Sequence, residues 1–203
     1  MKKLLLSVLT VCLLTNLGFA QETSAPTDTK KCGKKKFKCE KKIKSNANRS
    51  VYYKKLADDA TKKGDQNLAE VYNKCADAKS KIANGMKEVY DNSMRFKEIL
   101  ASDAELKASI CDKKMKNCLI DGKAKGKRFS TYIKKIKEYA DKSLAKAKQA
   151  DSEGKVDLAK KYNELASVIN AKAEGLKLVA EGKKEFKLAR KEFKALKKST
   201  SDK

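Results

Sequence analysis

The sequence contains one long stretch that occurs twice at a fixed offset, and this duplication limits the possible folds more than any other feature. The stretch from Leu56 to Val89, centred on Gly64, matches the stretch ninety positions later, centred on Gly154. From Ala57 to Phe96, thirteen residues are identical in this single register. The identical pairs are Ala57 and Ala147, Ala60 and Ala150, Gly64 and Gly154, Leu68 and Leu158, Ala69 and Ala159, Tyr72 and Tyr162, Asn73 and Asn163, Ala76 and Ala166, Ala83 and Ala173, Gly85 and Gly175, Lys87 and Lys177, Val89 and Val179, and Phe96 and Phe186. Such a repeat is typical of a duplicated helical hairpin in which each copy buries its apolar face against the other.

The composition favours helices over sheets. Of the 203 residues, 37% are charged and 40% are hydrophobic, and the chain has one Pro and neither Trp nor His. A chain rich in Ala, Lys, Glu and Leu with so few helix-breaking residues is expected to form long helices. Aromatic residues make up only 6%, so the core must consist mainly of Ala, Leu, Ile and Val.

Residues 1–20 have the pattern of a cleaved secretory signal peptide. Two lysines precede an apolar run over residues 4–14, and the small residues Gly18 and Ala20 close the segment. The run is too short to span a bilayer comfortably. We therefore expect an exported protein, secreted or periplasmic, with no integral membrane segment in the mature chain. Residues 21–29 are expected to form a disordered leader.

Apolar spacings of three and four residues predict long helices on both sides of each glycine. The helix from Gln66 to about Leu100 has the clearest pattern, with Ala69, Ala76 and Ala83 recurring every seven residues beside its stripe. Small residues at this spacing let two helices approach closely, as in an antiparallel coiled coil. The stripe itself consists of Leu68, Tyr72, Cys75, Lys79, Ile82, Met86, Val89, Ser93, Phe96 and Leu100.

The expected architecture is an all-α, up-down-up-down four-helix bundle over residues 30–198. Its parts are hairpins over about 30–100 and 123–198, a linking helix over 104–120 and a disordered tail over 199–203. Residues 102–105 are expected to form the cap and first turn of the linking helix. Each hairpin has one apolar stripe, and in this arrangement each hairpin covers the stripe of the other. A bend or break is expected in the first helix at the polar stretch 45–50.

Five cysteines remain once the signal peptide is removed, and four of them form two pairs with the same spacing. Cys32 and Cys39 are seven residues apart, as are Cys111 and Cys118. This spacing places both thiols of a pair on one helical face, roughly 10 Å apart, which is too far for a bond within the pair. We predict two disulfides between the pairs, in either of the two possible connectivities. The alternative is a metal or redox site made by the four thiols.

The fifth cysteine, Cys75, stands on the apolar stripe of its helix. Its position predicts a buried, unreactive thiol. An intermolecular disulfide is the alternative, because an odd cysteine in an exported protein has no partner within the chain.

The chain is strongly basic, with a formal net charge of +24, and removal of Lys2 and Lys3 with the signal peptide would leave +22. In the expected bundle both glycine turns lie at one end, and the basic segments 30–44, 113–137 and 183–203 gather at the other. The candidates for contact with a polyanion at this end are Lys34, Lys35, Lys36, Lys38, Lys113, Lys114, Lys116, Lys123, Lys125, Lys127 and Arg128.

Such a lysine-rich end predicts a binding protein for anionic partners. These are an anionic membrane surface, lipopolysaccharide or acidic polysaccharide, or nucleic acid, held by many weak contacts. The alternative is a structural or chaperone-like scaffold that oligomerises or binds a protein client, and the lysine excess can also be compositional. We expect no enzyme and no cofactor, because the chain lacks His as a general base and has no Gly-rich phosphate loop.

Overall fold

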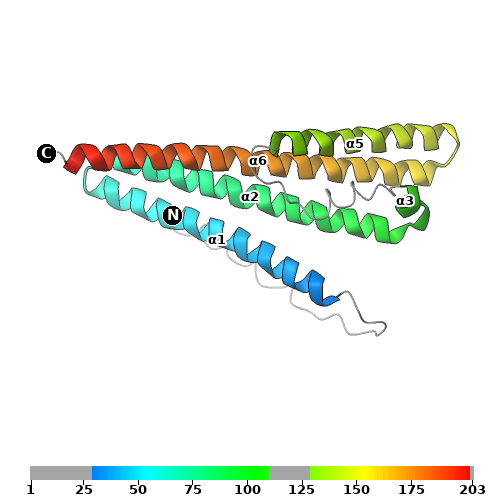
Figure 1. Cartoon of the computed structure of the whole chain (residues 1–203), viewed down its shortest axis with the longest axis horizontal. Helices are drawn as coiled ribbons and strands as arrows, with labels where there is room; N and C mark the ends of the chain where they lie inside the picture. Colours follow the sequence, from blue (N-terminus) through cyan, green and yellow to red (C-terminus); the bar gives the residue numbers. More distant parts are fainter. Residues whose placement is uncertain (1–28, 110–128, 202–203) are drawn as a thin grey trace, which may run out of the picture.

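The computed structural model describes residues 29–109 and 129–201, and these are helical apart from two tight turns and one junction. The helices are α1 (Thr29–Lys62), α2 (Gln66–Ser102), α3 (Ala104–Ser109), α5 (Phe129–Ser152) and α6 (Val156–Ser201). Figure 1 shows the long helices packed lengthwise in an elongated body. The predicted all-α class with long helices is therefore confirmed.

The same tight turn joins the two helices of each hairpin. Gly64 and Gly154 have φ angles of +79° and +73°, a left-handed conformation that glycine adopts without steric penalty. The residue after each glycine donates its backbone N–H to an alanine carbonyl at the end of the preceding helix, at 3.0 Å in the first turn and 2.8 Å in the second. Asp65 then caps α2, because its Oδ1 accepts the N–H of Leu68 at 3.0 Å. The glycine turns predicted from the sequence are present.

α2 and α6 form a central antiparallel pair. Near the start of α2, Lys74 Nζ lies 3.0 Å from Glu192 Oε2 near the end of α6. Just beyond the end of α2, Asp103 Oδ2 lies 2.6 Å from Lys161 Nζ near the start of α6. The two helices therefore remain in contact along the whole of α2.

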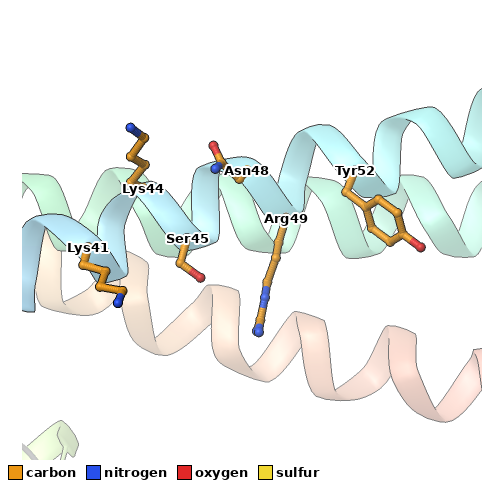
Figure 2. Close-up of a pocket in the computed structure, with 6 residues that line it drawn as sticks. All are labelled: Lys41, Lys44, Ser45, Asn48, Arg49 and Tyr52. Atoms are coloured by element: carbon orange, nitrogen blue, oxygen red, sulfur yellow. The ribbon is translucent and has the colours of Figure 1, made fainter.

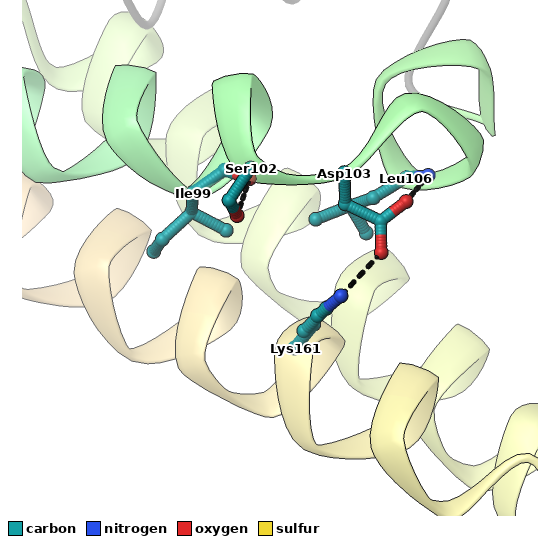
Figure 3. Close-up of polar contacts among 5 residues, drawn as sticks. All are labelled: Ile99, Ser102, Asp103, Leu106 and Lys161. Atoms are coloured by element: carbon teal, nitrogen blue, oxygen red, sulfur yellow. Dashed lines mark hydrogen bonds and ion pairs between the residues drawn. The ribbon is translucent and has the colours of Figure 1, made fainter.

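The corner between α2 and α3 is fixed by Asp103. Its Oδ1 accepts the N–H of Leu106 at 2.9 Å while its Oδ2 accepts from Lys161 (Figure 3). The hydroxyl of Ser102 donates to the carbonyl of Ile99 at 2.8 Å, which closes the last turn of α2. The cap predicted within residues 102–105 is present, with Asp103 as the capping residue. α3 is the described part of the linking helix predicted over 104–120.

The outer helices α1 and α5 lie on opposite sides of the α2–α6 pair (Figure 1). α1 packs along α2, and α5 packs along the first half of α6, where Lys137 Nζ lies 2.8 Å from Glu174 Oε1. The Gly64 turn therefore lies at one end of the molecule and the Gly154 turn at the other.

The up-down-up-down four-helix bundle is not confirmed, and the expectation that both glycine turns share one end is wrong. The physical reason is that α2 and α6 bury their stripes against each other along their length. Each outer helix then covers the half of this pair that is next to its own turn.

The two hairpins bury the same positions. Between residues 57–85 and 147–175, positions ninety apart have the same degree of exposure at all but three places. A cluster of buried apolar residues lies where α2, α3, α5 and α6 meet, around Phe96, Ile136 and Leu165. Residues ninety apart are thus equivalent positions of two similar hairpins.

Two boundaries differ from expectation. α1 continues without a break through the polar stretch 45–50, because the Ser50 hydroxyl donates across the interface to the carbonyl of Ala76 in α2 at 2.8 Å. A side chain satisfied in this way does not compete with the backbone of its own helix. α6 continues to Ser201, into the tail predicted to be disordered over 199–203. The predicted signal peptide 1–20 and almost all of the leader lie outside the described residues.

Candidate anion-binding groove

Six side chains of α1 line an open groove on the surface. They are Lys41, Lys44, Ser45, Asn48, Arg49 and Tyr52. They form two rows at four-residue spacing, so they cover one face of α1 over about 16 Å of helix. Figure 2 shows Lys41, Ser45 and Arg49 pointing to the side of α1 on which α6 runs. The residues that line the groove offer three cations, two hydroxyls and an amide, and include no carboxylate.

The part of α6 that runs beside α1 is also basic. Residues 183–198 include eight basic and two acidic residues. Both acids are ion-paired to α2, Glu185 with Lys81 at 2.5 Å and Glu192 with Lys74 at 3.0 Å. Because α2 neutralises these two carboxylates, they are not available to the cations of α6.

We call segments 41–55 of α1 and 183–198 of α6 the α1–α6 basic face. The α1 segment has six basic residues and no acidic residue. The rings of Tyr53 and Phe186, with centroids 5.9 Å apart, hold the two segments together. The face therefore combines positive charge from two helices that are distant in the sequence.

A buried lysine lies beneath this face. Lys79 of α2 is 7% exposed, and its Nζ lies 3.8 Å from the centroid of the Phe186 ring and 3.4 Å from Asn46 Oδ1. Burial lowers the pKa of Lys79 below its ordinary value, and the charges of Arg49 and Arg190 lower it further. The proton on Lys79 is thus held less tightly than on a lysine in water.

The three cations of this cluster come from three helices: Arg49 from α1, Lys79 from α2 and Arg190 from α6. Burial raises the pKa of Tyr53, and the charges of both arginines lower it. Within residues 29–109 and 129–201, neither arginine forms an ion pair with a carboxylate. In the described part of the protein, neither arginine therefore has a carboxylate that neutralises it.

Aromatic rings and a thiol fill the interface next to the cluster. The ring centroids of Tyr53 and Tyr72 are 6.4 Å apart, and those of Tyr72 and Phe193 are 5.6 Å apart. Cys75 is buried beside them with a free thiol, as its place on the stripe predicts. Burial is the main cause that raises the pKa of Cys75, and of both tyrosines, above their ordinary values. These groups are therefore held in their neutral forms.

Three polar residues of the first hairpin stand where the second hairpin has fully buried apolar residues. The equivalent pairs are Asn46 and Ile136, Ser50 and Ala140, and Lys79 and Ile169. The apolar members show that the fold accepts an apolar residue at each place. A buried lysine costs stability where an isoleucine would contribute to it. Polar residues that break the local packing rule in this way are expected at functional sites.

The residues predicted for polyanion contact cannot be compared with this groove. The side chains of Lys34, Lys35, Lys36 and Lys38 lie outside the described residues, as do Lys113, Lys114, Lys116, Lys123, Lys125, Lys127 and Arg128. The shared basic end itself is not formed as expected. The last part of α6 lies at the Gly64 turn, whereas the start of α1 lies away from that turn (Figure 1).

The predicted disulfides also remain predictions. Cys39 is half-buried and its thiol is free, while Cys111, Cys118 and the side chain of Cys32 lie outside the described residues. In the described part of the chain, no group of three or more His, Cys, Asp or Glu residues is placed to hold a metal ion.

Sequence reasoning missed Lys41, Lys44, Arg49 and Arg190 as site residues and placed Lys79 on the α2 stripe without a role. The signal that could have found the site is the repeat itself. Aligning the copies sets Lys79 against Ile169 and, in the other direction, Ile82 against the buried Lys172, so each copy interrupts an otherwise shared core with one lysine.

No helix within residues 29–109 and 129–201 is long and apolar enough to cross a membrane.

The sequence matches no family model and no curated protein, and the structure matches no solved structure. A function must therefore be argued from the groove and the charges around it.

Proposed function

We propose that the protein binds anionic polymers or anionic surfaces through the α1–α6 basic face. The observation that carries the proposal is the charge of this face. Its two segments hold fourteen basic residues, and their two acidic residues are already paired to α2. Like charges at this density destabilise a fold unless counter-charge comes from a partner.

The partners that fit this chemistry carry phosphate, sulfate or carboxylate groups. They are an anionic membrane surface, lipopolysaccharide or acidic polysaccharide, and nucleic acid. Lysine side chains contact such groups by many weak interactions, so affinity should depend strongly on salt. The proposal includes export directed by a signal peptide over residues 1–20. It also includes a duplicated hairpin, which provides a rigid support for the face.

Salt dependence tests the proposal. Binding of the mature chain to heparin and to anionic vesicles is measured at about 50 mM and about 200 mM salt. If about four charge contacts form, affinity should fall roughly a hundredfold between these conditions. Binding that is undetectable at the lower salt concentration for heparin, DNA and vesicles alike would contradict the proposal.

A pair of triple variants tests which surface binds. The test variant is Lys187→Gln, Lys191→Gln and Lys194→Gln on α6, and the control variant is Lys134→Gln, Lys135→Gln and Lys148→Gln on α5; all six lysines are exposed. Both variants lose the same net charge. The test variant should elute from heparin at clearly lower salt than the control variant. Equal elution would show that the α1–α6 basic face does not bind heparin in preference to the surface of α5.

A second candidate function is a scaffold that oligomerises or binds a protein client. It is favoured by large apolar side chains exposed on the same face, Val51 at 58% and Leu188 at 48%. Association through such side chains should persist at high salt, because screening does not weaken apolar contacts. Light scattering across the same salt series distinguishes the two candidates.

A further inference from the structure

We infer that helix α1 docks lengthwise on an anionic lipid bilayer through its outer strip. This strip consists of Lys41, Lys44, Asn48, Val51, Tyr52 and Lys55. Its two apolar side chains would lie among the lipid headgroups, and its lysines would contact the lipid phosphates. The inference rests on the proposed function, because it assigns a partner to one part of the α1–α6 basic face.

The spacing of the six residues places them on one side of α1. They follow one another at intervals of three or four residues, which is the spacing of one helical face. All six are exposed, and Figure 2 shows Lys44 and Asn48 pointing away from α6. The other side of α1 packs on α2, where the Ser50 hydroxyl donates to the Ala76 carbonyl. The outer strip therefore faces away from the helix that supports it.

The outer strip is cationic, and its lysines are not neutralised. Segment 41–55 has six basic residues and no acidic residue. Within residues 29–109 and 129–201, none of Lys41, Lys44 and Lys55 forms an ion pair with a carboxylate. Lysines at such a density are attracted to the negative surface potential of anionic lipids. Charge complementarity thus favours an anionic membrane as the partner of this strip.

Two large apolar side chains stand among these charges. Val51 and Tyr52 are each 58% exposed, more than any other large hydrophobic side chain in the described part of the chain. Tyrosine is enriched at membrane–water interfaces, where its ring can leave water while its hydroxyl stays hydrated. Lysines beside it can reach the phosphates while their apolar stems cover the same surface. This combination is typical of a helix that lies in the membrane interface.

A bilayer fits the outer strip better than a soluble polyanion does. An acidic polysaccharide offers negative charge without an apolar layer. Nucleic acid offers bases that stack on aromatic rings, which would engage Tyr52 alone. An anionic bilayer presents phosphate groups and, directly beneath them, acyl chains that can take up both Val51 and the ring of Tyr52.

Sedimentation with vesicles measures the docking. The full mature chain is mixed with vesicles of phosphatidylcholine alone and with vesicles that also contain phosphatidylglycerol. We expect binding only where phosphatidylglycerol is present. Equal binding to both kinds of vesicle, or binding to neither, would overturn the inference.

A double variant tests the apolar contribution. Val51→Gln with Tyr52→Gln removes both apolar side chains and no charge. Binding to phosphatidylglycerol vesicles should weaken roughly tenfold or more. The difference from the unmodified chain should remain when the salt concentration is raised, because screening does not weaken apolar contacts.

The matched control is Leu144→Gln with Val156→Gln. These two side chains are also exposed, at 38% and 51%, and they belong to α5 and α6. The control variant should bind the vesicles as the unmodified chain does. An equal loss in the two double variants would overturn the inference.

A tryptophan at the outer strip gives a readout that does not depend on the glutamine variants. The chain contains no tryptophan, so an introduced one reports only on its own surroundings. On phosphatidylglycerol vesicles, the emission of Tyr52→Trp should shift to shorter wavelength and be quenched by lipids with brominated acyl chains. The emission of Leu144→Trp should show neither effect. A Tyr52→Trp emission that stays unshifted while the chain sediments with the vesicles would overturn the inference.

Heparin retention separates this inference from the proposed function. Val51→Gln with Tyr52→Gln should elute from heparin as the unmodified chain does, because the net charge is unchanged. If heparin binds with the expected salt dependence and vesicles do not bind, the inference fails and the proposed function stands. If neither binds, both fail. If the double variant loses heparin and vesicle binding alike, the two side chains are not specific for a bilayer and the inference is overturned.

Discussion

Gly85 of α2 and Gly175 of α6 lie against each other at equivalent positions of the two hairpins, with their backbones in contact. A Cβ atom on Gly85 would lie 2.5 Å from the carbonyl oxygen of Gly175 and 2.9 Å from the Cβ of Leu178. Because the nearest atom belongs to the backbone, no side-chain movement can relieve the overlap. We predict that Gly85→Ala lowers the free energy of unfolding by about 1–3 kcal/mol, although alanine favours helices by about 1 kcal/mol. Urea unfolding measures this change.

Gly64→Ala is the control for this prediction. A Cβ on Gly64 would have no atom within 4 Å, and its φ of +79° is the only source of strain. The loss expected from the backbone conformation alone is about 1 kcal/mol. If Gly85→Ala were as stable as the unmodified chain, α2 and α6 could not approach as closely as described.

Lys79→Met should stabilise the folded chain at neutral pH by about 1 kcal/mol or more, because it replaces a buried cation with an apolar side chain of similar length. The folded-state pKa of Lys79 is lowered from its ordinary value of 10.5. The cost of the charge is therefore fully present below the folded-state pKa and is relieved as the pH rises through it. The advantage of the variant should shrink toward alkaline pH in denaturant titrations. An advantage that is constant with pH would contradict this account.

The hairpins could be predicted from the sequence because their signals are local. Gly64 and Gly154 each specify a turn whatever surrounds them, and Asp65 adds a cap in the first hairpin. The way in which the two hairpins pair could not be predicted. The apolar stripe of α2 can be buried along the length of α6 or inside a closed four-helix bundle, and the stripe itself does not distinguish the two arrangements. The contact that decides between these arrangements, Gly85 on Gly175, is visible in the sequence only as one identity among thirteen.

The candidate site was harder to predict than the fold. Lys79 lies on the predicted stripe of α2, but its neighbours Arg49 and Arg190 come from helices that lie far from it in the sequence. Charge counts along the chain found the basic segments of α1 and α6. They could not show that the acids of α6 are paired to α2, because that pairing depends on how the helices are packed.

Asp103 has two separable roles at the corner between α2 and α3. Asp103→Asn keeps an oxygen that can accept the N–H of Leu106 and loses the charge that attracts Lys161. Asp103→Ala loses both interactions. We expect Asp103→Ala to cost about 1–2 kcal/mol and Asp103→Asn to cost clearly less, as measured by thermal unfolding. Equal losses in the two variants would show that the cap contributes nothing.

The cysteines should differ in reactivity. In the reduced protein, Cys39 is half-buried and Cys75 is buried with a raised pKa, so iodoacetamide should label Cys39 much faster than Cys75. In the oxidised protein, a non-reducing peptide map should pair Cys32 and Cys39 with Cys111 and Cys118. Mass spectrometry reads both results. A Cys75 that labels as fast as Cys39 would contradict its burial, and a disulfide that contains Cys75 would favour the intermolecular alternative.

The tyrosines and the thiol at the α1–α2–α6 interface should make the fold sensitive to alkaline pH. Burial raises the folded-state pKa values of Cys75 and Tyr53 above their ordinary values of 9.0 and 10.0. The folded chain therefore holds these protons more tightly than the unfolded chain. The stability that results is fully present below the ordinary values and is lost as the pH rises through the folded-state values.

Two variants test this dependence. Tyr53→Phe removes a titrating group from the interface and keeps the ring that contacts Phe186. The melting temperature of this variant should fall less steeply above about pH 9 than that of the unmodified chain, because one fewer buried proton has to be lost. Tyr52→Phe is the matched control, since Tyr52 is the adjacent tyrosine and is 58% exposed; its melting curve should follow that of the unmodified chain. If the two variants give the same alkaline slope, burial of Tyr53 does not control the loss of stability.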